Sequence, residues 1–251
     1  MATIGIMDSG VGGLSVYREI VKALPGQHYV YFSDNAHCPY GNKSQEFIIE
    51  RCREITELFL SKGAEAVVIA CNTATAAAIA TLRSEYDIPF VGMEPAVKPA
   101  ALGTKSGVIG VLATAGTLKA SKYLQTRGRF EDEVIIAEHV GAGFVELVES
   151  GELDGPKAES TVSESLTPLL EKGADTIVLG CTHYPFLLPV LQKVAGSQIH
   201  FIDPAPAVAR RLVSVLEEKG ISMIDPTPGT ELLSSGTDIP LKRIFALIRP
   251  F

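Results

Sequence analysis

Cysteine is scarce in this 251-residue chain: there are four, and none lies close to another in the sequence. Cys38, Cys52, Cys71 and Cys181 lie far apart, without the C-x-x-C spacing of a zinc ribbon or a dithiol redox motif. Cys52 falls at helical spacing with apolar residues, which predicts a buried structural thiol. The pattern favours free thiols in a reducing compartment. We therefore expect a cytoplasmic protein with no bound metal.

Clustered basic residues and long apolar runs are also missing. The 22 Lys and Arg residues are scattered among 29 Asp and Glu, a net charge of -7, which argues against a nucleic-acid partner. The most apolar stretch, 66–82, is interrupted by Asn72 and Thr73 and indicates strand, loop and helix, not a membrane span. The first residues, MATIGIMDSG, lack the charged and apolar regions of an export signal. We expect no membrane association.

What the chain does contain is a regular alternation of short apolar runs and amphipathic segments. Strands are expected at TIGIM, HYVYFSD, AVVIA, PFVGM and GVIGVLA, and helices at 14–23, 44–62 and 73–83. A last strand and helix are expected around 231–235 and 241–248. The alternation is typical of parallel βαβ units, which bind ligands at the carboxyl ends of their strands. The predicted fold class is α/β with mainly parallel sheets.

Two segments are predicted to cross between lobes. Residues 95–107 are rich in Pro, Gly and Ala, and residues 203–207 read DPAPA before a helix. With these crossings, residues 1–94 plus 208–251 form a first α/β lobe and residues 95–207 form a second. We expect the ligand to bind in a cleft between them.

An internal repeat predicts that the two lobes are pseudo-symmetric. GAEAVVIACNTA (63–74) aligns without a gap with GADTIVLGCTHY (173–184), and IGIMDSG (4–10) aligns more weakly with IGVLATA (109–115). The stronger pair places Cys71 and Cys181 at equivalent strand ends. A duplicated half would therefore direct two equivalent thiols at one cleft.

These two cysteines are the candidate catalytic residues. Each follows an apolar strand and precedes a helix, where the positive end of the helix dipole favours thiolate. The pKa of a free cysteine thiol is about 8.5, so we expect a modest downward shift to bring the pKa of each thiol close to neutral pH. Inverting a stereocentre by proton exchange needs a base on one face and an acid on the other. Two thiols from two lobes meet that requirement.

Three further residues are candidate catalytic helpers. Asp8 ends the first strand and is expected to contact a substrate ammonium or to assist Cys71. His183 lies two residues after Cys181 and is expected to promote its thiolate form. Glu149 is expected to orient His183, as carboxylates often orient a functional histidine.

Other polar or conformationally special residues in the same loops suit an amino-acid carboxylate. Hydroxyls, amides and helix-end N–H groups can bind an anion without Arg. The candidate substrate-binding residues, with Asp8 and His183, are Ser9, Pro39, Tyr40, Gly41, Asn72, Thr73, Thr114 and Thr182.

Four motifs in these loops resemble the glutamate racemases of the aspartate/glutamate racemase family. They are DSGVGG (8–13), PYG (39–41), ACNTAT (70–75) and GCTHYP (180–185), in the family's order across nearly the whole chain. The resemblance implies a two-domain α/β enzyme that makes D-glutamate for bacterial peptidoglycan without pyridoxal phosphate, another cofactor or metal. It implies that Cys71 and Cys181 are the proton donor and acceptor and that the candidate residues above contact glutamate. It also implies a homodimer.

Other functions remain open from the residues alone. Gly10 and Gly12 after a strand, with Asp34 after the next, form a partial dinucleotide fingerprint, although Ser15 occupies the third glycine position. Cys71, Cys181, His183 and Asp8 could assemble a tetrahedral metal or redox site. A racemase of aspartate or of a hydantoin shares the two-thiol logic, and a duplicated scaffold that only binds a partner would share the fold.

Overall fold

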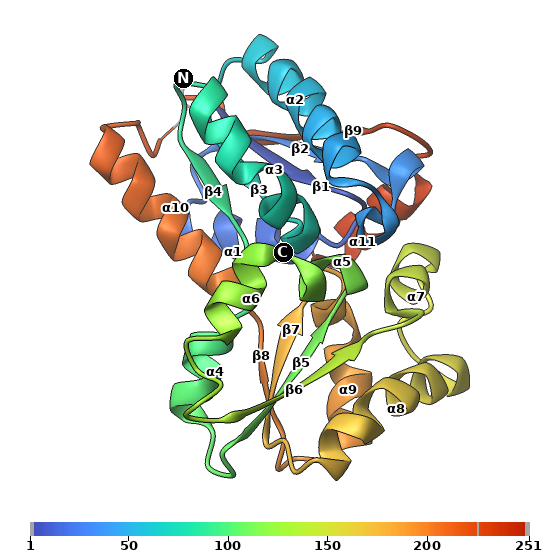
Figure 1. Cartoon of the computed structure of the whole chain (residues 1–251). Coiled ribbons are helices and arrows are strands. Elements are labelled where there is room, and N and C mark those ends of the chain that lie inside the picture. Colours follow the sequence, from blue (N-terminus) through green and yellow to red (C-terminus); the bar gives the residue numbers. More distant parts are fainter. Residues whose placement is uncertain (1–2, 225, 249–251) are drawn as a thin grey trace.

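The computed structural model describes residues 3–224 and 226–248 of the chain. They form two α/β lobes, which lie one above the other in Figure 1, and each lobe is built on its own parallel sheet. The predicted α/β class and two-lobed architecture are confirmed.

The first lobe contains a five-stranded sheet in the order β4-β3-β1-β2-β9, with every neighbouring pair parallel. The last strand and helix of the chain, predicted around 231–235 and 241–248, are present as β9 and α11. The strands are β1 (Thr3–Asp8), β2 (His28–Ser33), β3 (Ala64–Ile69), β4 (Phe90–Gly92) and β9 (Gly229–Ser234). The helices are α1 (Leu14–Ala23), α2 (Gln45–Ser61), α3 (Asn72–Glu85), α10 (Ala205–Lys219) and α11 (Ile239–Ile248), with short 3-10 turns η1 (Asn35–His37) and η2 (Tyr40–Asn42).

The second lobe contains a four-stranded sheet in the order β6-β5-β7-β8, again parallel throughout. Its strands are β5 (Val108–Ala113), β6 (Ile135–Val140), β7 (Thr176–Gly180) and β8 (His200–Ile202). Its helices are α4 (Val97–Gly103), α5 (Ala115–Lys119), α6 (Ser121–Arg127), α7 (Phe144–Ser150), α8 (Pro156–Glu171) and α9 (Leu188–Ala195), with the 3-10 turn η3 (Tyr184–Leu187).

The two sheets share one topology. The order β2-β1-β3-β4 of the first lobe corresponds to β6-β5-β7-β8 of the second, and β9 extends only the first sheet. The repeat in the sequence therefore reflects real structural equivalence: β1 matches β5, and β3 matches β7. Cys71 lies two residues after the end of β3, and Cys181 directly follows the matched strand β7.

Both faces of the inner strands are buried, which explains their nearly continuous apolar sequences. In β1, Ile4 and Ile6 pack in a cluster with α1 and α10, while Met7 faces the cluster formed with α2 and α3. The first of these clusters continues into the second lobe through residues such as Leu179 and Tyr184. The lobes thus share apolar packing beneath the carboxyl ends of their strands.

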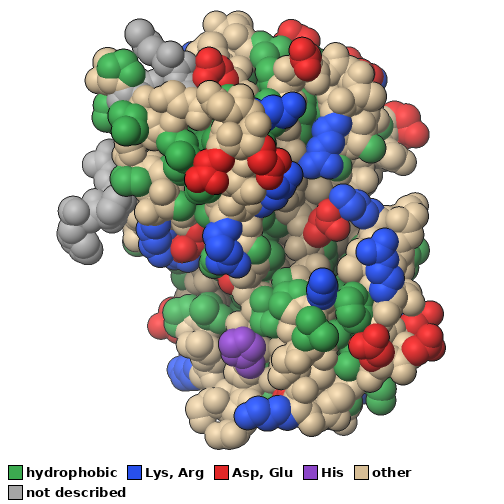
Figure 2. Space-filling model, turned by 90° about the vertical axis from the view of Figure 1, so that its left-hand side faces the viewer, with side chains coloured by type: hydrophobic (Ala, Val, Ile, Leu, Met, Phe, Trp, Pro, Cys, Tyr) green, Lys and Arg blue, Asp and Glu red, His purple; other side chains and the backbone are tan. Residues whose placement is uncertain are grey.

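The helices next to the predicted crossings pack on different lobes. Helix α4 packs on β5 and β7, whereas α10 packs on α1 and β4. The crossing points at 95–107 and 203–207 stay predictions. Along residues 3–224 and 226–248, the helices fall short of the length and apolarity that a membrane span requires. Figure 2 shows basic and acidic side chains intermingled over one face of both lobes, as the scattered charges of the sequence lead one to expect.

Candidate active site

One pocket collects the residues that follow the central strands of both sheets. Ser9 follows β1, Cys71 follows β3, Thr114 follows β5 and Cys181 follows β7, and all four line the same pocket. The space between its walls is about 280 Å³ when the open solvent at its mouth is included. The pocket therefore has room only for a small molecule.

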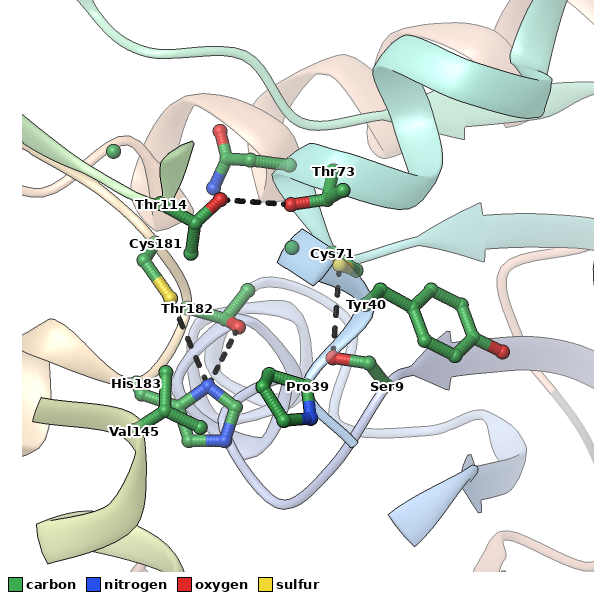
Figure 3. Close-up of a pocket in the computed structure, with 13 residues that line it drawn as sticks. Ser9, Pro39, Tyr40, Cys71, Thr73, Thr114, Val145, Cys181, Thr182 and His183 are labelled. Carbon is green, nitrogen blue, oxygen red and sulfur yellow. Dashed lines mark hydrogen bonds between the residues drawn. The ribbon is translucent and has the colours of Figure 1, made fainter. Parts of the chain in front are cut away.

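The pocket residues match the sequence predictions closely, with two additions and two exceptions. Val145 and Gly180 line the pocket but were not predicted, whereas Asp8 and Glu149 do not line it. Val145 has no polar atom that a motif search could find. The full lining is Ser9, Pro39, Tyr40, Gly41, Cys71, Asn72, Thr73, Thr114, Val145, Gly180, Cys181, Thr182 and His183, most of them labelled in Figure 3.

Cys71 is the N-cap of α3, and its sulfur lies on the side of the pocket that the first lobe forms, beside Ser9 (Figure 3). Its Sγ accepts a hydrogen bond from the Ala74 amide at 3.4 Å and lies 3.7 Å from Ser9 Oγ. The prediction of a lowered pKa is wrong for this thiol. Burial and the nearby charge of Asp8 raise the pKa of Cys71 to about 12 and outweigh the Ala74 amide. Without ligand, Cys71 is therefore a thiol at neutral pH.

Cys181 lies on the other side of the pocket, beside an imidazole that belongs to a hydrogen-bonded chain (Figure 3). The Sγ atom lies 3.7 Å from His183 Nδ1, and His183 Nε2 lies 2.7 Å from Glu149 Oε1. Glu149 also accepts a hydrogen bond from the Val11 amide at 2.8 Å. The structure thus brings together His183 and Glu149, a contact that their spacing in the sequence could not show.

The charges along this chain favour an imidazolium–carboxylate pair. Burial alone would lower the pKa of His183, but hydrogen bonds with Cys181, Cys38 and Glu149 raise it well above its ordinary value. Burial opposes ionisation of Glu149, yet its hydrogen bond with His183 holds its pKa below the ordinary value. An imidazolium beside Cys181 can donate a hydrogen bond to a thiolate there.

Asp8 lies fully buried beneath the pocket. Its carboxylate accepts hydrogen bonds from the Gly10 amide at 2.9 Å and from Thr182 Oγ1 at 3.1 Å, so it links the end of β1 to the loop after β7. Burial raises its pKa, although the charge of His183 acts in the opposite direction. Its predicted contact with substrate stays a prediction, and its visible contacts position Thr182.

The glycines of DSGVGG make room for these contacts. A Cβ at Gly12 would overlap the His183 ring and lie 2.6 Å from Thr182 Oγ1, and a Cβ at Gly10 would overlap the Glu149 carboxylate. These positions therefore lack side chains because the second lobe approaches closely. This packing gives the two glycines a role other than the dinucleotide fingerprint they resemble.

Asp34, the acidic residue of that partial fingerprint, is also engaged within the protein. Its carboxylate accepts hydrogen bonds from Tyr40 and Arg51, which together with the His37 contact hold its pKa at about 2 despite burial. The Tyr40 hydroxyl accordingly points away from the pocket in Figure 3. Tyr40 presents its other atoms to the pocket, next to Pro39, which follows a cis peptide bond.

Polar groups without partners also face the pocket. Both the amide nitrogen and the oxygen of buried Asn72 lack a hydrogen-bond partner within the described part of the chain. Buried amides are rarely left unpaired, so these atoms are available to a ligand. Nearby, the hydroxyls of Thr73, Thr114 and Thr117 lie 3.0 to 3.2 Å apart and join α3 to the second lobe.

The alternative metal site is not assembled as the sequence suggested. Among the residues that the structure describes, one group of three His, Cys, Asp or Glu residues has its ligand atoms all within 4.8 Å of one another, and it consists of Cys38, Glu149 and His183. Cys71, Cys181 and Asp8 are not part of that group. The pocket lining contains neither Lys nor Arg and neither Asp nor Glu, so any anion bound there meets neutral donors and the buried imidazole.

The fold and this site define a two-lobed α/β enzyme with a pair of thiols at a small-molecule pocket. Comparison with known proteins identifies the family. Residues 4–212 match the Asp/Glu/Hydantoin racemase family, and the chain belongs to it.

Curated relatives and solved structures of this family match almost the entire chain. Glutamate racemase from Ectopseudomonas mendocina is 47% identical over 248 residues, 98% of this chain and 94% of the relative. Glutamate racemase from Pseudomonas aeruginosa strain PAO1 is 45% identical over 248 residues, which are again 98% of this chain and 94% of the relative. The crystal structure of Escherichia coli glutamate racemase with L-glutamate and the activator UDP-MurNAc-Ala has a TM-score of 0.89 and 36% identity, covering 98% of this chain and 94% of that chain.

Proposed function

We propose that this protein is a glutamate racemase, which interconverts L- and D-glutamate by proton exchange at the α-carbon. The observation that carries the proposal is the pair of thiols, Cys71 and Cys181, delivered by equivalent strands of two lobes to one small pocket. The near full-length identity with glutamate racemases supports glutamate as the substrate.

The two thiols explain inversion, because one takes a proton from the α-carbon and the other returns a proton to it. One cysteine, as thiolate, takes the α-proton and becomes a thiol, leaving a carbanion that is planar at the α-carbon. The other cysteine, as thiol, gives its proton to the opposite face and becomes a thiolate. The product therefore leaves the pair with its protonation states exchanged, and the same residues run the reaction in reverse. Apparent pKa values of the reaction belong to the pair.

The environments of the two thiols suggest how the cycle begins. Burial keeps Cys71 protonated, so it is suited to donate first, while Cys181 faces an imidazole with a raised pKa. A substrate ammonium would bring a positive charge into the pocket and would oppose the Asp8 field that disfavours a Cys71 thiolate. In this proposal His183 supports Cys181, Glu149 positions His183, and Asp8 supports the Cys71 side.

Neutral donors would bind the two carboxylates of glutamate. The unpaired amide of Asn72 and the hydroxyls of Ser9, Thr73, Thr114 and Thr182 line the pocket, at or near the starts of segments that follow strands. Exposed N–H groups at such helix starts favour anions. Pro39, Tyr40 and Gly41 would shape the wall, and Gly41 lies directly against Thr114.

The test follows both hydrogen isotope and stereochemistry. Purified protein is incubated with L-glutamate in deuterated water without added cofactor, and deuterium at the α-carbon is measured alongside optical rotation. Loss of rotation with one deuterium gained per inversion is expected. Rotation lost without deuterium uptake, or no turnover at all, would overturn the proposal. L-aspartate and a hydantoin, offered separately, test the other substrates of the family.

The wider role follows from the substrate. We propose that the D-glutamate serves bacterial peptidoglycan synthesis, that the enzyme works in the cytoplasm, and that it forms a homodimer. The family resemblance and the free cysteines support these proposals.

A further inference from the structure

Three side chains with different donor atoms meet beside the catalytic pocket. Cys38 Sγ lies 3.7 Å from Glu149 Oε1, and the same oxygen lies 2.7 Å from His183 Nε2. The ligand atoms of the three residues all lie within 4.8 Å of one another. Cys38 comes from the first lobe and the other two from the second, so the cluster exists only where the lobes meet.

The cluster lies between the catalytic pocket and a second, more open cavity. Cys38 and Glu149 line this outer cavity, which measures about 680 Å³ with the open solvent at its mouth included, whereas His183 lines the catalytic pocket. The Cys38 side chain is half-buried and Glu149 retains about a fifth of its exposure, so a solute can reach both from the outer cavity. A route of entry therefore leads to the cluster without passing through the substrate pocket.

Thiolate, imidazole and carboxylate form a donor set that suits a thiophilic divalent cation. Tetrahedral bonds of about 2.0 to 2.3 Å place ligand atoms about 3.4 Å apart. The observed separations of 2.7 and 3.7 Å bracket that value, so small side-chain rotations suffice. We propose that Cys38, Glu149 and His183 bind one divalent cation of the Zn²⁺ class, with water from the outer cavity as fourth ligand.

The bound ion would inhibit the enzyme. Binding releases to solvent the Cys38 thiol proton and the proton shared by His183 Nε2 and Glu149, and the ion takes the place of both. His183 is then a metal ligand and can no longer supply an imidazolium beside Cys181. This consequence rests on the proposed racemase function, whereas the binding itself does not.

Binding is tested without reference to activity, using Co²⁺ as a spectroscopic probe. The double variant C71S/C181S removes the two catalytic thiols, which could otherwise capture the ion. On titration of this protein with Co²⁺ we expect one equivalent to give a thiolate-to-metal charge-transfer band and the intense visible bands of tetrahedral coordination. The triple variant C38S/C71S/C181S should lose the charge-transfer band.

The matched control removes the remaining cysteine. Cys52 is fully buried in the first-lobe core, and C52A/C71S/C181S should keep the whole Co²⁺ spectrum. A spectrum that survives loss of Cys38, or that fails to appear in the double variant, would overturn the site. Correct folding of each variant is checked by circular dichroism.

The effect on turnover is measured with Zn²⁺ on the otherwise unchanged chain and on C38S. Each rate is divided by the metal-free rate of the same protein, and C38S should need at least about tenfold more Zn²⁺ for half-inhibition. Equal sensitivity of the two proteins would contradict inhibition through this cluster. Absence of any racemase activity, with the Co²⁺ spectrum intact, would instead count against the proposed function and leave the metal site standing.

Discussion

The two thiols occupy equivalent places in the repeat but have different neighbours. Cys71 accepts a hydrogen bond from a backbone amide and contacts Ser9, while Cys181 contacts the His183 ring. The asymmetry lets one thiol rest protonated while the other is paired with an imidazole, which is the arrangement that a two-base exchange requires.

Serine at either position should abolish inversion but not all chemistry. C71S and C181S should each lower kcat for racemisation of both enantiomers by about 10³-fold or more, because one proton carrier is lost. The thiol that remains should still exchange the α-proton of the enantiomer that faces it, so the two variants should label opposite enantiomers in deuterated water. C52A, which removes a thiol from the core, is the control. Substantial inversion by either serine variant would refute the two-thiol assignment.

The His183–Glu149 pair predicts a change in pH dependence. In E149Q the carboxylate that raises the His183 pKa is gone while burial, which lowers it, remains, so the pKa should fall. The imidazolium would then be lost at lower pH, and the alkaline limb of kcat/KM should move to lower pH. The overall rate should fall about 10- to 100-fold. NMR titration of His183 and a pH–rate profile measure the two effects.

The control for that profile is E152Q, which alters an exposed carboxylate just after α7 that is paired with Lys157. Its pH profile should match that of the unaltered protein. A His183 pKa that falls in E149Q without moving the alkaline limb would show that turnover does not need the imidazolium.

Among the elements, the turn between β1 and α1 depends on what the second lobe places against it. G12A should leave the sheet intact but displace His183 and Thr182, because the new Cβ occupies their space. Misplacement of a catalytic group by about 1 Å costs about 100-fold in rate, so a loss of that order in kcat/KM is expected. G103A adds the same atom in α4 with nothing within 4 Å and should be active. Comparable activity of the two variants would contradict this packing role.

The sequence predicted some of these elements and contacts but not others. Apolar runs of strand length and the repeated cysteine identified the strands of the first lobe, the inner strands β5 and β7 of the second, and the two thiols, because these depend on local pattern. The outer strands β6 and β8 of the second lobe were not predicted. The same pattern could not show that Asp8 lies beneath the pocket or that the Tyr40 hydroxyl turns to Asp34. The position of Asp8 depends on Thr182 of the opposing lobe, and the direction of the Tyr40 hydroxyl depends on Asp34 within its own lobe. Both are contacts between residues that local sequence pattern does not relate.

At the scale of the whole molecule, hydrogen bonds join the lobes around the pocket. Thr182 donates to Asp8, Ser15 donates to the Thr182 carbonyl, and the Val11 amide donates to Glu149. Together with the shared apolar cluster, these contacts set the separation of the two thiols. Residues of both lobes line the pocket and most of them are buried, so we expect the lobes to part slightly for exchange of substrate and product.

The threonine cluster offers a way to test that movement. Thr117 bonds to Thr73 across the lobes but does not line the catalytic pocket. T117V keeps the shape of the side chain and removes the hydroxyl, so the closed arrangement should lose about 1 kcal/mol. We expect KM for glutamate to rise about fivefold with kcat changed less than about twofold, because the loss bears on closure around substrate and not on the thiols. T167V removes an exposed hydroxyl on α8 and should change neither constant. If T117V lowered kcat and left KM unchanged, the cluster would act on the chemical step, and closure of the lobes would not depend on it.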